Sequence, residues 1–182
     1  MPIRFVGHAI VSADDRIADA AGGFPASLRN AADWALFQAA LDRAALVLIG
    51  RASHDAAPNV TGRRRLIVSR GVRGLERRAG GDWLNPAEVP LDDALATLLP
   101  AGGEVAVPGG QAVFDLVGAD RFSAFHLARS HRVRLPGGRG LFRACEAGVP
   151  AAAILAGGGL EPGPAEVIDP AAAVTLTIWS RP

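Results

Sequence analysis

The sequence predicts an α/β fold with a mostly parallel central sheet and an antiparallel edge at its C-terminal end. Short continuous apolar runs such as Ala45–Ile49 alternate with segments of helical periodicity. This pattern is typical of parallel strands that are buried on both faces and joined by right-handed crossovers. Two further apolar runs near the C-terminus, Ala151–Leu155 and Ala173–Trp179, read as strands and indicate the antiparallel edge.

The length and composition favour one domain over residues 1–182. The chain has 182 residues, of which 49% are hydrophobic, so one sizeable core can be buried. No internal repeat or low-complexity linker interrupts it. We interpret the glycine and proline cluster at 157–164 as a hairpin loop between the last two strands.

The helices and strands expected along the chain are separated by clear boundary residues. Ile3–Ser12 is expected to be the first buried strand, and residues 14–25 a polar, glycine-rich loop. Ser27–Leu41 has helical periodicity, with Asn30 as the N-cap. The other expected elements are strands at Ala45–Ile49, Arg65–Ser69, Glu104–Val107 and Phe122–Leu135, and helices at Leu91–Leu99 and Gly110–Val117.

The composition excludes several classes of function. The formal net charge is +1, which argues against a nucleic-acid or membrane partner. All 19 basic residues are arginine, and there is neither lysine nor tyrosine, so Schiff-base enzymes, Walker-type phosphate sites and Tyr-Lys dehydrogenases are excluded. The single cysteine, Cys145, and four scattered histidines predict no metal site. Without a signal-peptide pattern or a long apolar run, we expect a cytoplasmic protein.

One carboxylate stands out on the first helix. Asp33 and Phe37 are four residues apart and share a helix face. An acid beside an aromatic ring suits a flat heterocycle, with the carboxylate accepting hydrogen bonds from its edge. Asp33 also lies three residues after Asn30, where an acid favours the helix dipole and can complete a capping box. The ligand-binding and capping interpretations both stay open.

Two strand ends lead into helices through glycine-containing turns. Gly50, Arg51 and Ser53 follow one strand, and Gly109–Ala112 follow another. Glycine lets the backbone approach a ligand closely, and the free N–H groups of the next helix attract anions. Together the two turns predict a pyrophosphate site, although the G-x-G-x-x-G fingerprint is absent.

A third feature is the arginine-rich segment Thr61–Gly71. Ser69 and Arg70 follow its strand and, together with Arg51, suit a phosphate monoester. A solvated charged rim is the alternative for each of these arginines.

The ordered set of motifs resembles the dihydrofolate reductase family and the related reductase domain of riboflavin biosynthesis. The likeness runs from Ile3 to Trp179. The motifs are SADDRIAD, Gly23-Phe24-Pro25, ADWALF, LIGRAS, GRRRLIVSR, VPGGQAVFDLV and LPGGRGLF.

This resemblance implies a three-layer fold, NADPH as cofactor and specific roles for the residues. Asp33 would bind the amino-pyrimidine edge of a pterin, with Phe37 and Phe24 against the substrate and Arg63 on a folate glutamate. The stretch 19–24 would be the mobile loop over the nicotinamide. The cofactor residues implied are Gly50, Arg51, Ser53, Ser69, Arg70, Gly109, Gly110, Gln111 and Ala112, with a cis peptide bond between Gly109 and Gly110.

Departures from the family pattern leave the substrate open. Ala26 replaces the usual tryptophan, Ala128 the usual threonine, and Gln111 the third glycine of the cofactor turn. We expect hydride transfer to a dihydropterin of the dihydrofolate or dihydromethanopterin type. The alternatives are a riboflavin-pathway pyrimidine reductase, a non-catalytic NADPH-binding protein and a structural interaction domain. Whether the chain forms a homodimer stays open.

Overall fold

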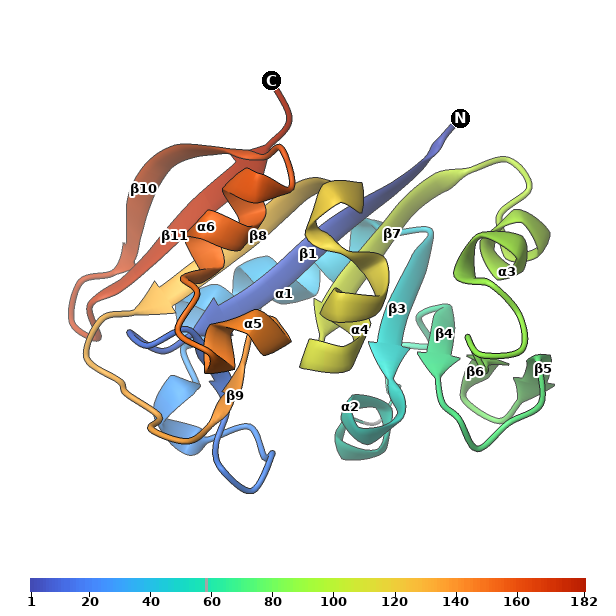
Figure 1. Ribbon diagram of the computed structural model, residues 1–182, viewed down its shortest axis with the longest axis horizontal. Helices are drawn as coiled ribbons and strands as arrows, with labels where there is room; N and C mark the ends of the chain where they lie inside the picture. Colours follow the sequence, from blue (N-terminus) through green and yellow to red (C-terminus); the bar gives the residue numbers. More distant parts are fainter. Residues whose placement is uncertain (58) are drawn as a thin grey trace.

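The computed structural model describes residues 1–57 and 59–182. Within them, nine strands form one sheet in the order β10-β11-β8-β1-β7-β3-β4-β6-β5 (Figure 1). Strands β8 to β6 in this order run parallel, whereas β5, β11 and β10 are antiparallel to their neighbours. The predicted parallel sheet with an antiparallel C-terminal edge is therefore confirmed. The strands are β1 (Ile3–Val11), β3 (Leu46–Gly50), β4 (Arg65–Val68), β5 (Leu75–Arg78), β6 (Gly81–Leu84), β7 (Gly103–Gly109), β8 (Phe122–Ser130), β10 (Glu161–Asp169) and β11 (Val174–Ser180).

Helices cover both faces of this sheet and make the fold three-layered. Helix α1 lies on one face, where Leu41 packs on Val47 and Ala106. Helices α3, α4 and α6 cover the other face and enclose the main core (Figure 1). The helices are α1 (Ala31–Arg43), α2 (Arg51–Ala56), α3 (Leu91–Leu98), α4 (Gln111–Val117), α5 (Arg143–Glu146) and α6 (Ala151–Gly157), with 3-10 turns at Ala26–Leu28 and Ala119–Arg121.

The capping signal for α1 is confirmed. The side-chain oxygen of Asn30 accepts a hydrogen bond from the backbone N–H of Asp33 at 3.0 Å. The helix starts at Ala31, later than predicted, because the segment from Ala26 forms a separate 3-10 turn after Pro25. It then runs two residues past the predicted end, to Arg43.

The prediction of a strand at Ala151–Leu155 is wrong. This segment is the first part of helix α6, which follows Pro150. Alanine has the highest helix propensity, and a short apolar run does not by itself distinguish a buried strand from a buried helix. The predicted hairpin loop at 157–164 is also wrong in part, because Pro162 and Pro164 lie within edge strand β10, where proline is tolerated.

Four short strands lie in segments without a strand signal. Strands β5 and β6 form an antiparallel hairpin at one edge of the sheet. Strand β2 (Arg16–Ala18) lies inside the predicted loop 14–25 and pairs with β9 (Arg139–Gly140). The β2–β9 pair anchors the start of this loop to the segment after β8.

Strand β1 lies between β7 and β8, so both of its edges are paired. On one face, Gly7 makes room for the ring of Phe125, since a Cβ at Gly7 would lie 2.2 Å from that ring. The opposite face, toward α1, carries His8. No helix among the described residues is long and apolar enough to cross a membrane.

Candidate functional site

Asp33 lies in the first turn of α1 with its carboxyl group half-buried and unpartnered. No hydrogen bond from the described part of the chain reaches the carboxylate, including the reciprocal bond from Asn30 that a capping box requires. Capping is performed by the Asn30 side chain, so this role does not account for the Asp33 carboxyl group.

Burial raises the pKa of Asp33 from 3.8 to about 6. A carboxylate loses hydration in this position and gains neither a cation nor a hydrogen-bond donor in return. Such an uncompensated acid beside a hollow is typical of a ligand-binding or catalytic group.

Phe37 lies one turn after Asp33 and forms part of the same wall. Its ring stacks on Trp34, with centroids 5.5 Å apart, and meets the ring of His8 edge-on at 6.4 Å. The helix thus presents an acid and an aromatic ring toward the sheet, as the i, i+4 spacing predicted.

Two histidines complete this wall from the sheet side. His8 on β1 and His126 on β8 are register partners, and their ring centroids are 4.7 Å apart. Burial lowers the pKa of His8 to about 3, with further lowering from His126 and Arg43. Sequence reasoning missed both, although a histidine inside an otherwise apolar strand was a usable signal. Ala128, the expected counterpart of the family threonine, packs instead with Ile10 and Val174.

The hollow beside Asp33 is small. Its volume is about 20 Å³, and its walls include His8, Phe37, His126 and Leu176. This is room for about one water molecule. A bicyclic ring therefore reaches Asp33 only if one of the surrounding side chains moves.

Arg63 lies beside α1, but its guanidinium group is already engaged. It pairs with Asp42 at 2.7 Å and donates to the carbonyl oxygen of Gln38 at 3.3 Å. Its side chain is 12% exposed. The guanidinium group that would bind a glutamate tail is thus already paired with a carboxylate of α1.

Phe24 does not line the Asp33 hollow. It is 53% exposed, in the loop that leads to α1. This loop is closed on itself, because the Asp19 carboxylate accepts hydrogen bonds from the backbone N–H groups of Ala21 and Gly23. Ala26, which replaces the family tryptophan, is exposed in the following 3-10 turn.

The two predicted glycine turns lie side by side at the carboxyl ends of β3 and β7. Ile49 and Gly109 are register partners, and a Cβ at Gly50 would lie 3.4 Å from Val113 on α4. The peptide bond between Gly109 and Gly110 is cis. A Cβ at Gly110 would meet no atom within 4 Å, so this turn presents open backbone.

The residues predicted to bind a phosphate monoester lie close together at the carboxyl end of β4. A methyl group at Gly71 would lie 3.4 Å from the Ser69 hydroxyl and 3.7 Å from Nη1 of Arg51. Ser69 is buried, and its hydroxyl accepts a hydrogen bond from Gly71 N. Arg70 is exposed beside them.

The remaining predicted cofactor residues divide into two groups. Ser53 is half-buried on α2, and Ala112 is exposed at the start of α4. The Gln111 side chain turns away from the glycine pair and donates to Gly140 O at 3.1 Å and to Glu146 at 2.6 Å. Gln111 thereby joins α4 to β9 and α5.

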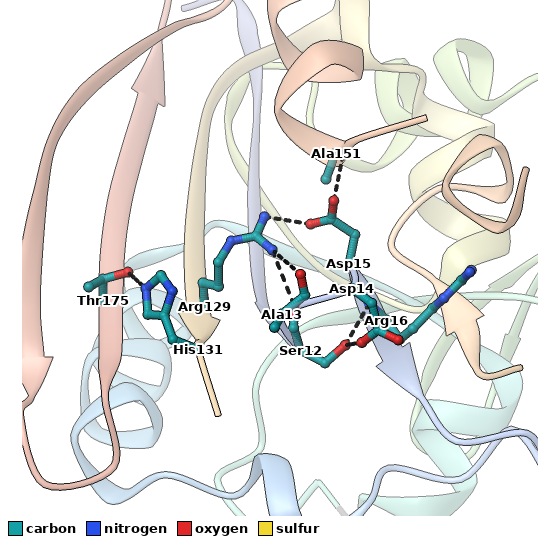
Figure 2. A network of polar contacts seen from close by, with 9 residues as sticks. All are labelled: Ser12, Ala13, Asp14, Asp15, Arg16, Arg129, His131, Ala151 and Thr175. Carbon is teal, nitrogen blue, oxygen red and sulfur yellow. Dashed lines mark hydrogen bonds and ion pairs between the residues drawn. The ribbon is translucent and has the colours of Figure 1, made fainter. Parts of the chain in front are cut away.

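The end of β1 is fixed by a polar network (Figure 2). Arg129 on β8 pairs with Asp15 and donates to the carbonyl oxygens of Ser12 and Ala13. The other carboxylate oxygen of Asp15 accepts from Ala151 N at 3.0 Å. This network holds the root of the loop 14–25 against β8 and α6.

The described residues contain no group of three or more histidine, cysteine, aspartate or glutamate side chains placed to hold a metal ion. The site instead offers exposed backbone and arginine side chains at the carboxyl ends of the parallel strands. It also offers the unpartnered carboxyl group of Asp33 on α1.

Comparison with known proteins places the fold. No family model and no curated protein sequence matches the chain. Among solved structures, a putative riboflavin biosynthesis protein from Shewanella sp. PV-4 is similar, with a TM-score of 0.65, 18% identity and 99% of each chain covered. The dihydrofolate reductase of Enterococcus faecalis, complexed with NADP(H) and RAB-propyl, has a TM-score of 0.67 and 15% identity, over 98% of this chain and 96% of that one.

A third similar structure is the Thermotoga maritima diaminohydroxyphosphoribosylaminopyrimidine deaminase/5-amino-6-(5-phosphoribosylamino)uracil reductase. Its TM-score is 0.68 and its identity 16%, over 100% of this chain. The chain spans 57% of the length of that protein. The mixed sheet, the helices on both faces and these three likenesses show that this chain has the dihydrofolate reductase-like fold.

Proposed function

We propose that this protein is an NADPH-dependent reductase that transfers a hydride to a dihydropterin, with a riboflavin-pathway pyrimidine reductase as the alternative. The observation that carries the proposal is the Asp33 carboxyl group, half-buried, without a partner and with its pKa raised to about 6. All three similar structures are named as proteins of reductive or riboflavin-forming metabolism.

The residues present fit a dinucleotide with a phosphorylated ribose. Gly50 and the open Gly109–Gly110 turn offer backbone that a pyrophosphate can approach. Arg51, Ser69 and Arg70 would hold the 2′-phosphate, through a guanidinium fork and a hydroxyl group. Ser53 and Ala112 would border the phosphates. When bound, NADPH supplies the hydride.

The chain's own contribution is binding, orientation and exclusion of water. Asp33 would accept hydrogen bonds from the amino-pyrimidine edge and stabilise the protonated ring, while Phe37 packs on it. The stretch 19–24, which follows the root fixed by the Asp15–Arg129 pair, would close over the reacting atoms, with Phe24 brought to the ring.

Two observations favour a substrate without a glutamate tail. Arg63 is engaged by Asp42, and the hollow beside Asp33 is only about 20 Å³. The pyrimidine head of a riboflavin-pathway substrate is a single ring and needs less space beside Asp33 than a bicyclic pterin.

The test is the NADPH absorbance change with dihydrofolate, dihydromethanopterin and the riboflavin-pathway aminopyrimidine. We expect turnover of one of them, strongly reduced in Asp33→Asn with NADPH affinity retained. Asp93→Asn, an exposed acid in the first turn of α3, is the matched control and keeps full activity. NADPH binding without turnover of any compound would indicate a nucleotide-binding protein and not a reductase. The absence of NADPH binding would contradict both of these functions.

A further inference from the structure

A second hollow lies at the amino ends of the parallel strands, whereas the glycine turns lie at their carboxyl ends. Its volume is about 290 Å³, and it opens between the last turn of α1 and the first residues of β1, β7 and β8. Its polar lining consists of Arg4, His8, Arg43, Glu104, Ser123 and His126. The volume is close to the lower end of those of known small-molecule pockets.

This hollow is separate from the proposed cofactor site. The glycine turns and Ser69 lie at the carboxyl ends of β3, β4 and β7, whereas Arg4 and Glu104 lie at the amino ends of β1 and β7. His8 and His126 line both this hollow and the small one at Asp33, so their paired rings form the partition between them.

The lining carries a surplus of positive charge. Arg4 and Glu104, which are register partners on β1 and β7, form a loose pair at 3.7 Å. Arg43, at the end of α1, forms no ion pair with any described residue. The hollow therefore has one guanidinium group without a counter-charge.

The deep wall contains an unsatisfied polar atom. His8 is 4% exposed, and its Nε2 has no hydrogen-bond partner among the described residues. A buried polar atom without a partner destabilises the protein. Val6, Ala40 and Ala124 supply apolar wall between His8 and the mouth.

We propose that this hollow is a second binding site, specific for a small organic acid with one carboxylate. The carboxylate pairs with Arg43, the body of the acid lies against Val6, Ala40 and Ala124, and the imidazole rings of His8 and His126 form its floor. The proposal concerns a site that the reductase reaction does not use, so it stands or falls independently of that activity.

The first experiment follows the ring C–H signals of the four histidines by NMR during titration with benzoate. His8 and His126 line the hollow, whereas His54 and His131 lie elsewhere and serve as internal references. We expect the signals of His8 and His126 alone to shift. Benzamide, which has the same shape without the charge, should shift them far less. Equal shifts with both compounds, or none with benzoate, would overturn the proposal.

Variants locate the bound acid. Arg43→Gln should weaken benzoate binding about tenfold, as expected for the loss of one charged hydrogen-bonding partner. Arg64→Gln removes an exposed charge just before β4, outside the hollow, and should leave the affinity unchanged. Ala124→Leu fills the hollow without changing charge and should also weaken binding.

A last variant distinguishes the two hollows. Asp33→Asn should not change benzoate affinity, because Asp33 lines only the small hollow. If Asp33→Asn alters the affinity and Arg43→Gln does not, the acid binds at the Asp33 site and the proposed second site is wrong. Saturating NADPH should likewise leave benzoate binding unchanged.

Discussion

The imidazole rings of His8 and His126 face each other from neighbouring parallel strands, with centroids 4.7 Å apart. Both histidines are neutral at physiological pH, because burial lowers the pKa of each. They lie under α1 between the small hollow at Asp33 and the larger one at Arg43. The pair therefore limits the size of any ring that reaches Asp33.

His8→Ala should enlarge the space beside Asp33 and lower the KM for a bicyclic dihydropterin relative to a single-ring pyrimidine. Removal of the ring joins the two hollows and also removes a buried, unpartnered nitrogen. The ratio of kcat/KM for the two substrate classes measures the effect. His131→Ala, at an exposed position, is the control. An unchanged ratio would mean that His8 does not restrict access.

The pH dependence of turnover should report Asp33. Its carboxyl group is ionised above a pKa of about 6, so kcat/KM falls as the pH drops through that value. In Asp33→Asn this dependence should disappear along with most of the activity. A profile that keeps the same inflection in the variant would assign it to another group.

The same acid should affect the pH dependence of stability. Because the folded-state pKa is raised from 3.8 to about 6, the folded protein binds the proton more tightly, and stability decreases as the pH rises between these values. Asp33→Asn should therefore be more stable than the wild type by about 1–2 kcal/mol at neutral pH. The difference should vanish below about pH 3, where the carboxyl group is protonated in both the folded and the unfolded state. Urea unfolding at several pH values measures this, and a destabilised variant at neutral pH would contradict it.

Arg51→Gln should reduce the preference for NADPH over NADH. Arg51 and Ser69 flank the same glycine, Gly71, and Arg51 has only a solvent-exposed pair with Asp55 at 3.4 Å. Loss of one charged contact to the 2′-phosphate should weaken NADPH binding about tenfold or more and leave NADH binding nearly unchanged. Fluorescence titration with each nucleotide measures both affinities. Equal weakening of the two would place Arg51 on the pyrophosphate instead.

The Asp15–Arg129 pair should stabilise the fold measurably. Its side chains are only 14% and 23% exposed, and both make further hydrogen bonds to backbone groups (Figure 2). A double-mutant cycle of Asp15→Asn and Arg129→Gln should give a coupling energy of about 1–2 kcal/mol. The exposed Arg51–Asp55 pair is the comparison and should give about 0.5 kcal/mol or less. Equal coupling in the two pairs would show that the network adds nothing beyond a surface ion pair.

Local chemistry made part of this structure predictable. Asn30 caps α1 as its residue type and position indicated, and the spacing of Asp33 and Phe37 placed both on the wall of one hollow. The glycines after β3 and β7 could be predicted to lie side by side, because the carboxyl ends of neighbouring parallel strands lie at the same end of the sheet. In each case the information lies within a few residues of the chain.

The rest depends on contacts between distant segments. The pairing of His8 with His126 follows from the register of β1 and β8, which no local pattern specifies. The engagement of Arg63 by Asp42 depends on how the segment before β4 meets α1. The run Ala151–Leu155 is apolar in either structure, and its helical state is decided by packing on the core.

The two prolines in β10 have a consequence for self-association. Strand β10 is the outermost strand of the sheet, and most of its residues are exposed. Pro162 and Pro164 lack the N–H group that an incoming strand would need, so the first half of this border cannot template a continuous ladder. The prolines therefore hinder the growth of an extended, fibril-like sheet at the exposed edge strand β10.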